Sequence, residues 1–269
     1  YTRLQNKQYK EAIEDFDKFI FQENKVADAY IGRGAAYLYL KDTVRALENF
    51  DQAIRTNREN PNGYYQRGTL LLQKEEYARA EADFDMSIRC DSTFLPPYFN
   101  RAVVYSNTNR PMQALADFDR VLQLDSTNSF TYFNRAILRT QIGDYNRALD
   151  DFDRVALYSP GNVQVYYLRA MLKTRLGDLE GAERDYTRAI ELYPDFANAY
   201  LNRSALRYAL HNPKGAKRDE EIAQRKIAAY KSHLKDSTYS IYADTTQRMD
   251  KLLAFDNQFT NSYFDRISE

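Results

Sequence analysis

The chain has 269 residues and carries 38 Lys and Arg against 38 Asp and Glu, so its formal net charge is zero. A neutral chain lacks the basic surplus that nucleic-acid or anionic-membrane binding requires, so we expect no nucleic-acid partner. Hydrophobic residues make up 43%, which excludes intrinsic disorder. No apolar run approaches the ~18 residues that cross a bilayer, so we expect no direct membrane insertion within this chain. The one cysteine, Cys90, excludes an intramolecular disulfide and a cysteine-rich zinc site.

The sequence repeats itself every 34 residues without insertion or deletion. The first two columns are Tyr30, Tyr64, Tyr98, Tyr132, Tyr166 and Tyr200, followed three residues later by Arg33, Arg67, Arg101, Arg135, Arg169 and Arg203. A small residue stands next to each Arg. A further column, Ala12, Ala46, Ala80, Ala114, Ala148, Ala182 and Ala216, is followed four residues later by Phe16, Phe50, Phe84, Phe118, Phe152 and Tyr186. Columns that stay in phase this long indicate a tandem array.

Each repeat predicts two helices. The first helices are expected to run about fourteen residues from near Ala27, Pro61, Leu95, Ser129, Val163 and Ala197. The second helices carry their Ala, aromatic and apolar residues on one buried face. Gly143-Asp144 and Gly177-Asp178 mark the turns between them, where a first helix ends and a second helix is capped. A small residue beside the Arg allows the two helices of a repeat to approach closely.

This spacing resembles the tetratricopeptide repeat, in which large-x2-Leu-Gly-x2-Tyr, Ala-x3-Phe and Pro recur. The match is carried by Tyr64-x2-Arg67-Gly68 with Ala80-x3-Phe84, and by Tyr166-x2-Arg169-Ala170 with Ala182-x3-Tyr186 and Pro194. Two departures from the family pattern recur along the sequence: Tyr replaces the frequent Trp, and Arg replaces the usual Leu at the seventh position. The resemblance implies an all-α fold, a right-handed α-solenoid or superhelix of tandem antiparallel helix pairs.

The resemblance covers residues 1–234, which we expect to form the array. It begins with a partial first repeat, residues 1–26, because Tyr1 stands at the ninth position of its repeat. Full repeats start near residues 27, 61, 95, 129, 163 and 197. Residues 235–269 are predicted to form a C-terminal capping helical segment, because the end of an array needs a solubilising cap. The alternative is that this segment folds back into the groove.

A column of acidic residues recurs with the same period as the Arg column. The carboxylates that flank the aromatic of each second helix are Asp15, Asp17, Asp51, Asp83, Asp85, Asp117, Asp119, Asp151, Asp153 and Asp185. We expect a structural ladder of Arg–Asp pairs that fixes the register of the repeats. In the alternative, some Arg side chains face the groove and hold a partner's carboxylate.

In the tetratricopeptide family the first helices line a concave groove that holds peptide segments. Carried over to this sequence, the groove positions place aromatic rings beside side-chain amides. The predicted partner-binding groove consists of Tyr65, Phe99, Asn100, Phe133, Asn134, Tyr167 and Asn202. Rings supply contact area, and Asn can bond both the C=O and the N–H of a partner's backbone. The alternative is that the rings pack between neighbouring first helices.

One subclass of the family grips the C-terminal tail of heat-shock chaperones with a two-carboxylate clamp. Asn100 and Asn134 supply its middle element, but Tyr65 and Phe99 occupy the positions that need Lys. The clamp is absent, so we do not expect a chaperone tail as partner.

Catalysis finds little support in the sequence. It contains no HExxH motif, no phosphate-cradling Gly-rich loop and no nucleophile elbow. His211 and His233 are expected to be solvated, and Cys90 is expected to be a small packing residue. We therefore predict no enzymatic activity, no metal site and no cofactor.

The leading hypothesis is a protein–protein interaction scaffold with a concave groove lined by aromatic and amide side chains. The alternative is a trimmed adaptor region of a larger enzyme, sensor or cell-envelope assembly protein, and a weaker one is self-association through the end repeats. Because the sequence starts at Tyr1 and not at Met, we expect a trimmed start. Both a cytoplasmic location and export with removal of a signal peptide stay open.

Overall fold

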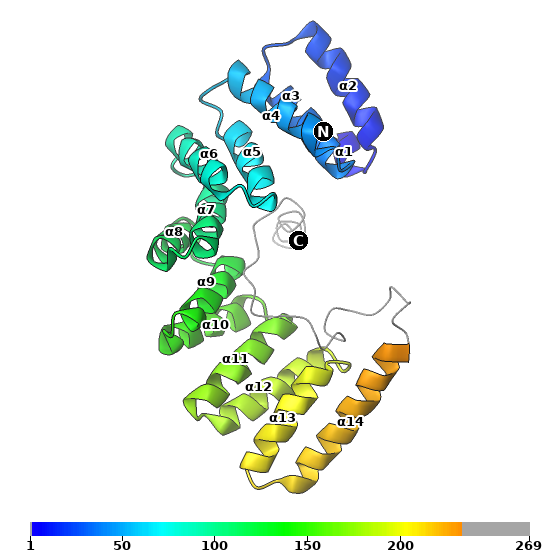
Figure 1. Ribbon diagram of the computed structural model, residues 1–269, viewed down its shortest axis with the longest axis vertical. Coiled ribbons are helices and arrows are strands. Elements are labelled where there is room, and N and C mark those ends of the chain that lie inside the picture. The colour runs from blue at the N-terminus through cyan, green and yellow to red at the C-terminus, as the bar shows by residue number, and fades with distance from the viewer. Residues whose placement is uncertain (1, 233–269) are drawn as a thin grey trace. The chain divides into compact units, whose positions relative to one another are not determined.

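The computed structural model describes residues 2–232, which are helical and form two compact units divided between Ser126 and Thr127 (Figure 1). The first unit contains α1 (Thr2–Gln5), α2 (Tyr9–Gln22), α3 (Ala27–Tyr39), α4 (Thr43–Thr56), α5 (Pro61–Gln73), α6 (Tyr77–Cys90), α7 (Leu95–Asn107) and α8 (Pro111–Leu124). The second contains α9 (Ser129–Gln141), α10 (Tyr145–Tyr158), α11 (Val163–Leu176), α12 (Leu179–Leu192), α13 (Ala197–Ala209) and α14 (Pro213–Ser232).

The helices pack as adjacent antiparallel pairs, one pair for each repeat: α3 with α4, α5 with α6, α7 with α8, α9 with α10, α11 with α12 and α13 with α14. The predicted fold class, an all-α tandem of helix pairs, is confirmed. Each first helix begins at the residue from which the sequence analysis expects it to run. Proline opens α5, α8 and α14, where its missing N–H and fixed φ suit a helix start. The first repeat is represented by the single turn of α1 before α2.

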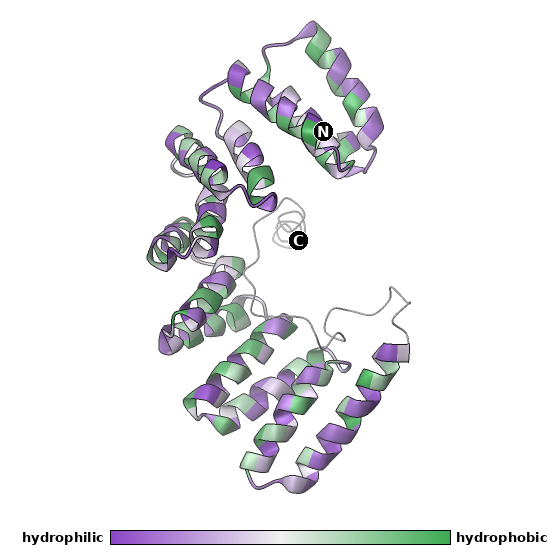
Figure 2. Cartoon of the chain, in the orientation of Figure 1, coloured by the Kyte–Doolittle hydropathy of each residue, from purple (hydrophilic) through white to green (hydrophobic). Residues whose placement is uncertain are grey.

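Each helix contains both hydrophilic and hydrophobic residues, as the colouring of the ribbon in Figure 2 shows. The residues of the Ala and aromatic columns form the apolar side of each second helix. Phe50, Phe84 and Phe118 have no exposed surface, and Phe152 keeps 2%. The small residue of the first helix leaves room for these rings. At Gly68 an added Cβ would lie 2.9 Å from the Phe84 ring, so the two helices could not approach as closely.

A residue with positive φ follows the end of every first helix, at the same phase of the repeat. These residues are Lys7, Lys41, Glu75, Asn109, Gly143, Gly177 and His211. At the end of α5 the Glu75 N–H donates to Leu72 O at 3.0 Å and the Glu76 N–H donates to Leu71 O at 2.9 Å. This paired arrangement closes a helix and requires the left-handed conformation. Gly fills it in two repeats, while the other repeats accept the strain of a side chain.

Replacing Glu75 with Gly is expected to stabilise the protein by about 0.5–1 kcal/mol, because the relief of left-handed strain exceeds the added freedom of the unfolded chain. Glu75 is exposed with φ 60°, so the change removes no buried contact. The reverse change, Gly143→Ala, has open space around the new Cβ and a φ of 86°, so strain alone should destabilise it. Urea unfolding of both variants measures the two effects, and a stabilising Gly143→Ala would contradict the argument.

The helix caps match the sequence expectation in part. The Asp178 carboxylate accepts from the Gly181 N–H at 2.9 Å and caps α12, whereas Asp144 makes no such bond at the start of α10. The predicted capping segment, residues 235–269, and His233 lie outside the described residues. Within residues 2–232, no helix has the length and apolar character needed to cross a bilayer.

Candidate functional site

The Arg and Asp columns form a set of pairs within each unit, and we call these pairs the Arg–Asp ladder. Nε and Nη2 of Arg67 donate to the two carboxylate oxygens of Asp83 at 2.8 and 2.7 Å, and Nη1 donates to Asp51 at 2.6 Å. Arg101 repeats this geometry with Asp117 at 2.8 and 2.7 Å and with Asp85 at 2.6 Å. Each Arg therefore ties its own first helix to the second helix of the same repeat and to that of the preceding repeat.

The ladder recurs in the second unit. Arg169 is held by Asp185 at 2.8 and 2.5 Å and by Asp153 at 2.8 Å. Nε and Nη2 of Arg203 donate to the two carboxylate oxygens of Asp219, each at 2.8 Å. Nη1 of Arg203 donates to Oγ1 of Thr187, which stands where the other repeats have a carboxylate. The ladder also includes the bonds of Arg135 to Asp151 and of Arg33 to Asn49 and Asp17. Asn49 replaces the Asp of the second helix in the Arg33 pairing.

Burial sets the electrostatics of the ladder. Burial raises the pKa of the Asp117 carboxyl above its ordinary value, and the bonds from the Arg101 guanidinium oppose that rise. The hydrogen bond to Asp83 raises the pKa of Arg67. The side chains of Arg101 and Asp117 are 17% and 9% exposed. Three N–H groups of each of these arginines already donate to two carboxylates of this chain. The geometry therefore favours a structural role over recognition of a partner's carboxylate.

A second basic column was not recognised in the sequence. Arg139, Lys173 and Arg207 stand four residues after a ladder Arg, on the same helix face. They contact the buried carboxylates of Asp151, Asp185 and Asp219 at 2.6, 2.8 and 2.9 Å. The sequence signal for this column is the i, i+4 spacing of two basic residues on one first helix. Both basic residues then lie on the side of the helix that faces the Asp column, so both can contact the same carboxylate.

The rings predicted to line the groove are buried. Tyr65, Phe99, Phe133 and Tyr167 are 3%, 0%, 3% and 9% exposed. Phe99 meets Phe118 edge to face with ring centroids 5.3 Å apart, and the pairs Phe133–Phe152 and Tyr167–Tyr186 repeat this contact at 6.3 and 5.8 Å. The rings therefore join a first helix to its own second helix.

Two of these rings also contact the segment before the next first helix. The Tyr65 ring lies 5.3 Å from Phe94, and the Tyr167 ring lies 4.7 Å from Phe196. The rings therefore pack against their own second helix and, in these two repeats, against the segment before the next first helix, whereas the alternative placed them between neighbouring first helices.

Two of the three predicted amides, Asn100 and Asn202, bond across to the neighbouring first helix, whereas Asn134 bonds within its own helix. Nδ2 of Asn100 donates to Oγ1 of Thr69 at 3.2 Å, which links α7 to α5. Nδ2 of Asn202 donates to the Tyr167 hydroxyl at 3.0 Å, which links α13 to α11. Nδ2 of Asn134 donates to the backbone oxygen of Phe130 at 2.8 Å. Asn100 and Asn134 are fully buried, while Asn202 is half-buried.

Four residues on each first helix share one side of it, and we call these residues together the first-helix face; Gly32, Asn100, Val103, Asn134, Ile137 and Leu168 of this set are buried and the others are half-buried or exposed. In the first unit it comprises Asp28, Gly32, Ala35 and Tyr39 on α3, Asn62, Gln66, Thr69 and Gln73 on α5, and Pro96, Asn100, Val103 and Asn107 on α7. In the second unit it comprises Phe130, Asn134, Ile137 and Gln141 on α9, Gln164, Leu168, Met171 and Arg175 on α11, and Asn198, Asn202, Ala205 and Ala209 on α13. The spacing i, i+4, i+7, i+11 places each set of four on one side of its helix. Contacts of α5 with both α3 and α7 make the sets of the first unit neighbours.

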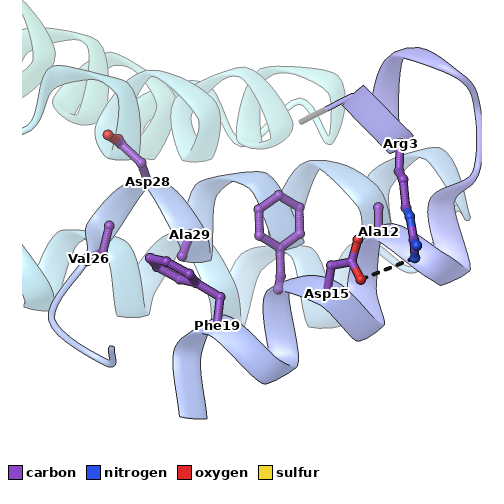
Figure 3. Close-up of a pocket in the computed structure, with 8 residues that line it drawn as sticks. Arg3, Ala12, Asp15, Phe19, Val26, Asp28 and Ala29 are labelled. Atoms are coloured by element: carbon purple, nitrogen blue, oxygen red, sulfur yellow. Dashed lines mark hydrogen bonds and ion pairs between the residues drawn. The ribbon is translucent and has the colours of Figure 1, made fainter. Parts of the chain in front are cut away.

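A cleft of about 500 Å³ lies beside α2 and the start of α3 (Figure 3). Its walls include Ala12, Phe19 and Ala29, and Arg3 pairs with the half-exposed carboxylate of Asp15 at 3.1 Å. The second helix of the next repeat shows what normally covers such residues: its Ala and Phe columns are fully buried against the first helix α3. The cleft thus marks the place where the single turn of α1 leaves α2 uncovered.

Reactive side chains do not gather at either surface. The thiol of Cys90 is half-buried, with Sγ 3.5 Å from the backbone oxygen of Arg58, and burial raises its pKa. His211 is exposed in a turn. Across residues 2–232, His, Cys, Asp and Glu form no group of three that could hold a metal ion.

Tandem helix pairs with closed interiors define an α-helical repeat scaffold. Family models described as tetratricopeptide repeat match residues 36–93 and 163–196. The chain contains tetratricopeptide repeats, which support a role as a scaffold for protein–protein interaction. The search of curated proteins found no match to this sequence.

Solved structures share the fold. The C-terminal part of a TPR repeat-containing protein from Cytophaga hutchinsonii is 19% identical with a TM-score of 0.65, covering 92% of this chain and 98% of that one. A tetratricopeptide repeat protein from Parabacteroides merdae is 20% identical with a TM-score of 0.61, covering 87% and 94%. YrrB, described as a TPR protein with an unusual peptide-binding site, is 23% identical with a TM-score of 0.59, covering 70% and 96%.

Proposed function

We propose that this protein is a non-enzymatic scaffold that holds a peptide or a segment of a partner protein in a groove along the first-helix face of a unit. The predicted groove residues serve in two ways. The rings of Tyr65, Phe99, Phe133 and Tyr167, with the buried amides of Asn100 and Asn134, support the groove from beneath. Asn202 and the exposed residues of the first-helix face contact the partner.

The observation that carries this proposal is that exposed amide side chains stand on helices whose interior is filled by tightly packed aromatic rings. Asn62, Gln73 and Asn107 are exposed on α5 and α7, and inside the α7–α8 pair Phe99 is fully buried against Phe118. A surface held in place by packed rings loses little conformational freedom when a partner binds. Side-chain amides offer both a donor and an acceptor to a peptide backbone. The description of YrrB as a peptide-binding TPR protein is consistent with this use of the fold.

The proposal is tested by selecting short displayed peptides on the intact 269-residue chain and measuring their affinity by fluorescence anisotropy. The triple variant Asn62→Ala, Gln73→Ala and Asn107→Ala should weaken the selected peptides at least about tenfold, because contact amides at the centre of an interface carry much of its energy. Its melting temperature should not change, since all three side chains are exposed.

A matched control changes three exposed amides of the second helices, Gln22→Ala, Gln113→Ala and Gln123→Ala. This variant should bind the same peptides as the unmodified protein. Equal binding by both triple variants would overturn the groove, and so would a selection that enriches no peptide.

A further inference from the structure

The first-helix face is nearly free of charge. Charged residues make up 28% of the chain, yet of the 24 residues of the face, 12 in each unit, the charged ones are Asp28 and Arg175. Both charges are engaged: the guanidinium of Arg175 lies over the Tyr145 ring, 4.6 Å from its centroid, and the Asp28 carboxylate accepts a hydrogen bond from Nδ2 of Asn60 at 3.0 Å. The neutral balance of the chain therefore does not extend evenly over its surface.

The charges are concentrated in the Arg–Asp ladder and on the second helices. Ladder arginines such as Arg67 and Arg101 face the second helices and bond carboxylates on both sides. On α4 the exposed residues include Arg45, Glu48 and Arg55. The same 34-residue period thus separates a charged side from an uncharged side of the helix pairs.

The uncharged side is still polar. Along α5 it presents two amides and a hydroxyl at Asn62, Gln66 and Thr69, with Gln73 beyond them, and α7 adds the exposed amide of Asn107. On α11 it presents Met171, 46% exposed, and on α13 it presents the exposed Ala205. Amides and short apolar groups complement main-chain groups and uncharged side chains. A charged partner residue would lose its hydration on such a face without meeting a counter-charge.

We infer that the first-helix face of each unit binds a charge-poor polypeptide segment and that this binding is insensitive to salt. The inference rests on the proposed function and adds the chemical class of its partner. Attraction between opposite charges weakens as salt screens it, whereas hydrogen bonds and apolar contacts do not depend on ionic strength in this way. Selection against acidic and basic segments follows from the absence of counter-charges on the face.

The experiment offers the intact chain three displayed peptide libraries that differ in composition: one without Asp, Glu, Lys or Arg, one rich in Asp and Glu, and one rich in Lys and Arg. We expect the uncharged library to be enriched at least about tenfold over the other two, with affinities that change less than about twofold between about 50 and about 500 mM NaCl. Enrichment of a charged library, or an affinity that falls about tenfold or more with salt, would overturn the inference.

A matched pair of variants shows whether the selection acts at this face. Gln73→Glu places a charge on the face and should weaken the uncharged peptides at least about fivefold, because the new carboxylate must lose hydration on binding. Gln113→Glu places the same charge at an exposed position of α8 and should leave affinity unchanged. Equal affinity of both variants would overturn the inference. If charged peptides bind and the alanine triple variant releases them, the groove stands and the inference alone fails.

Discussion

Arg101→Leu is expected to lower the free energy of unfolding by about 3–5 kcal/mol, because it removes one partner of a buried ion pair and leaves the other without a counter-charge. Arg101 bonds Asp117 twice and Asp85 once, and its guanidinium also lies 5.7 Å from the centroid of the Tyr98 ring. Asp117 would stay on α8 as a buried carboxylate. Urea unfolding followed by circular dichroism measures the loss.

The control for this variant is Arg79→Leu. Arg79 pairs with Glu76 at 2.5 Å, but its side chain is 64% exposed. An exposed pair contributes about 0–1 kcal/mol, so this variant should unfold almost like the unmodified protein. Weaker binding of selected peptides by Arg101→Leu at an unchanged melting temperature would contradict the structural role of the ladder.

The loss caused by Arg101→Leu should also depend on pH. Burial already raises the pKa of Asp117, and without Arg101 nothing offsets that rise. An acid whose pKa is higher in the folded state than in the unfolded state binds its proton more tightly when folded, so its destabilising effect appears as pH rises above the ordinary value of 3.8. The difference from the unmodified protein should therefore be smaller near about pH 4 than near about pH 7.5.

The phase of the repeat was sufficient to predict the helix pairs and the pairing of the two charged columns. Arg67 and Asp83 lie on different helices, but their spacing of 16 residues recurs in the later repeats, so one pairing implies the others. The pairing to the preceding repeat, such as Arg67 with Asp51, follows from the same spacing in the opposite direction. A tandem array allows this inference because each repeat meets the same neighbours.

The orientation of the groove rings could not be predicted in the same way. Tyr65 occupies a position that lines the groove in the family, and its burial depends on how closely the segment containing Phe94 approaches. That approach is set by the packing of successive repeats, which spacing alone does not specify. The positive φ of Glu75 and His211 escaped prediction because neither residue type signals the left-handed conformation that Gly143 signals in its repeat.

Phe118→Ala is expected to lower the free energy of unfolding by about 3–5 kcal/mol, as large-to-small changes in a core do when the cavity cannot collapse. Phe118 is fully buried on α8, and its ring meets Phe99 on α7 edge to face at 5.3 Å. Ala102 on α7 and Ala114 on α8 also have no exposed surface, and short side chains of this kind cannot extend into the vacated space. Phe118→Leu keeps most of the volume and should cost about half as much or less.

Phe21→Ala supplies the matched control, because Phe21 is 91% exposed at the end of α2. The same substitution there should change stability by no more than about 0.5 kcal/mol. Since a repeat contacts its immediate neighbours, hydrogen exchange in Phe118→Ala should accelerate first in α7 and α8. Losses of equal size at the two positions would show that Phe118 does not carry the core of its repeat. Uniform acceleration across the first unit would show instead that its helix pairs unfold as one block.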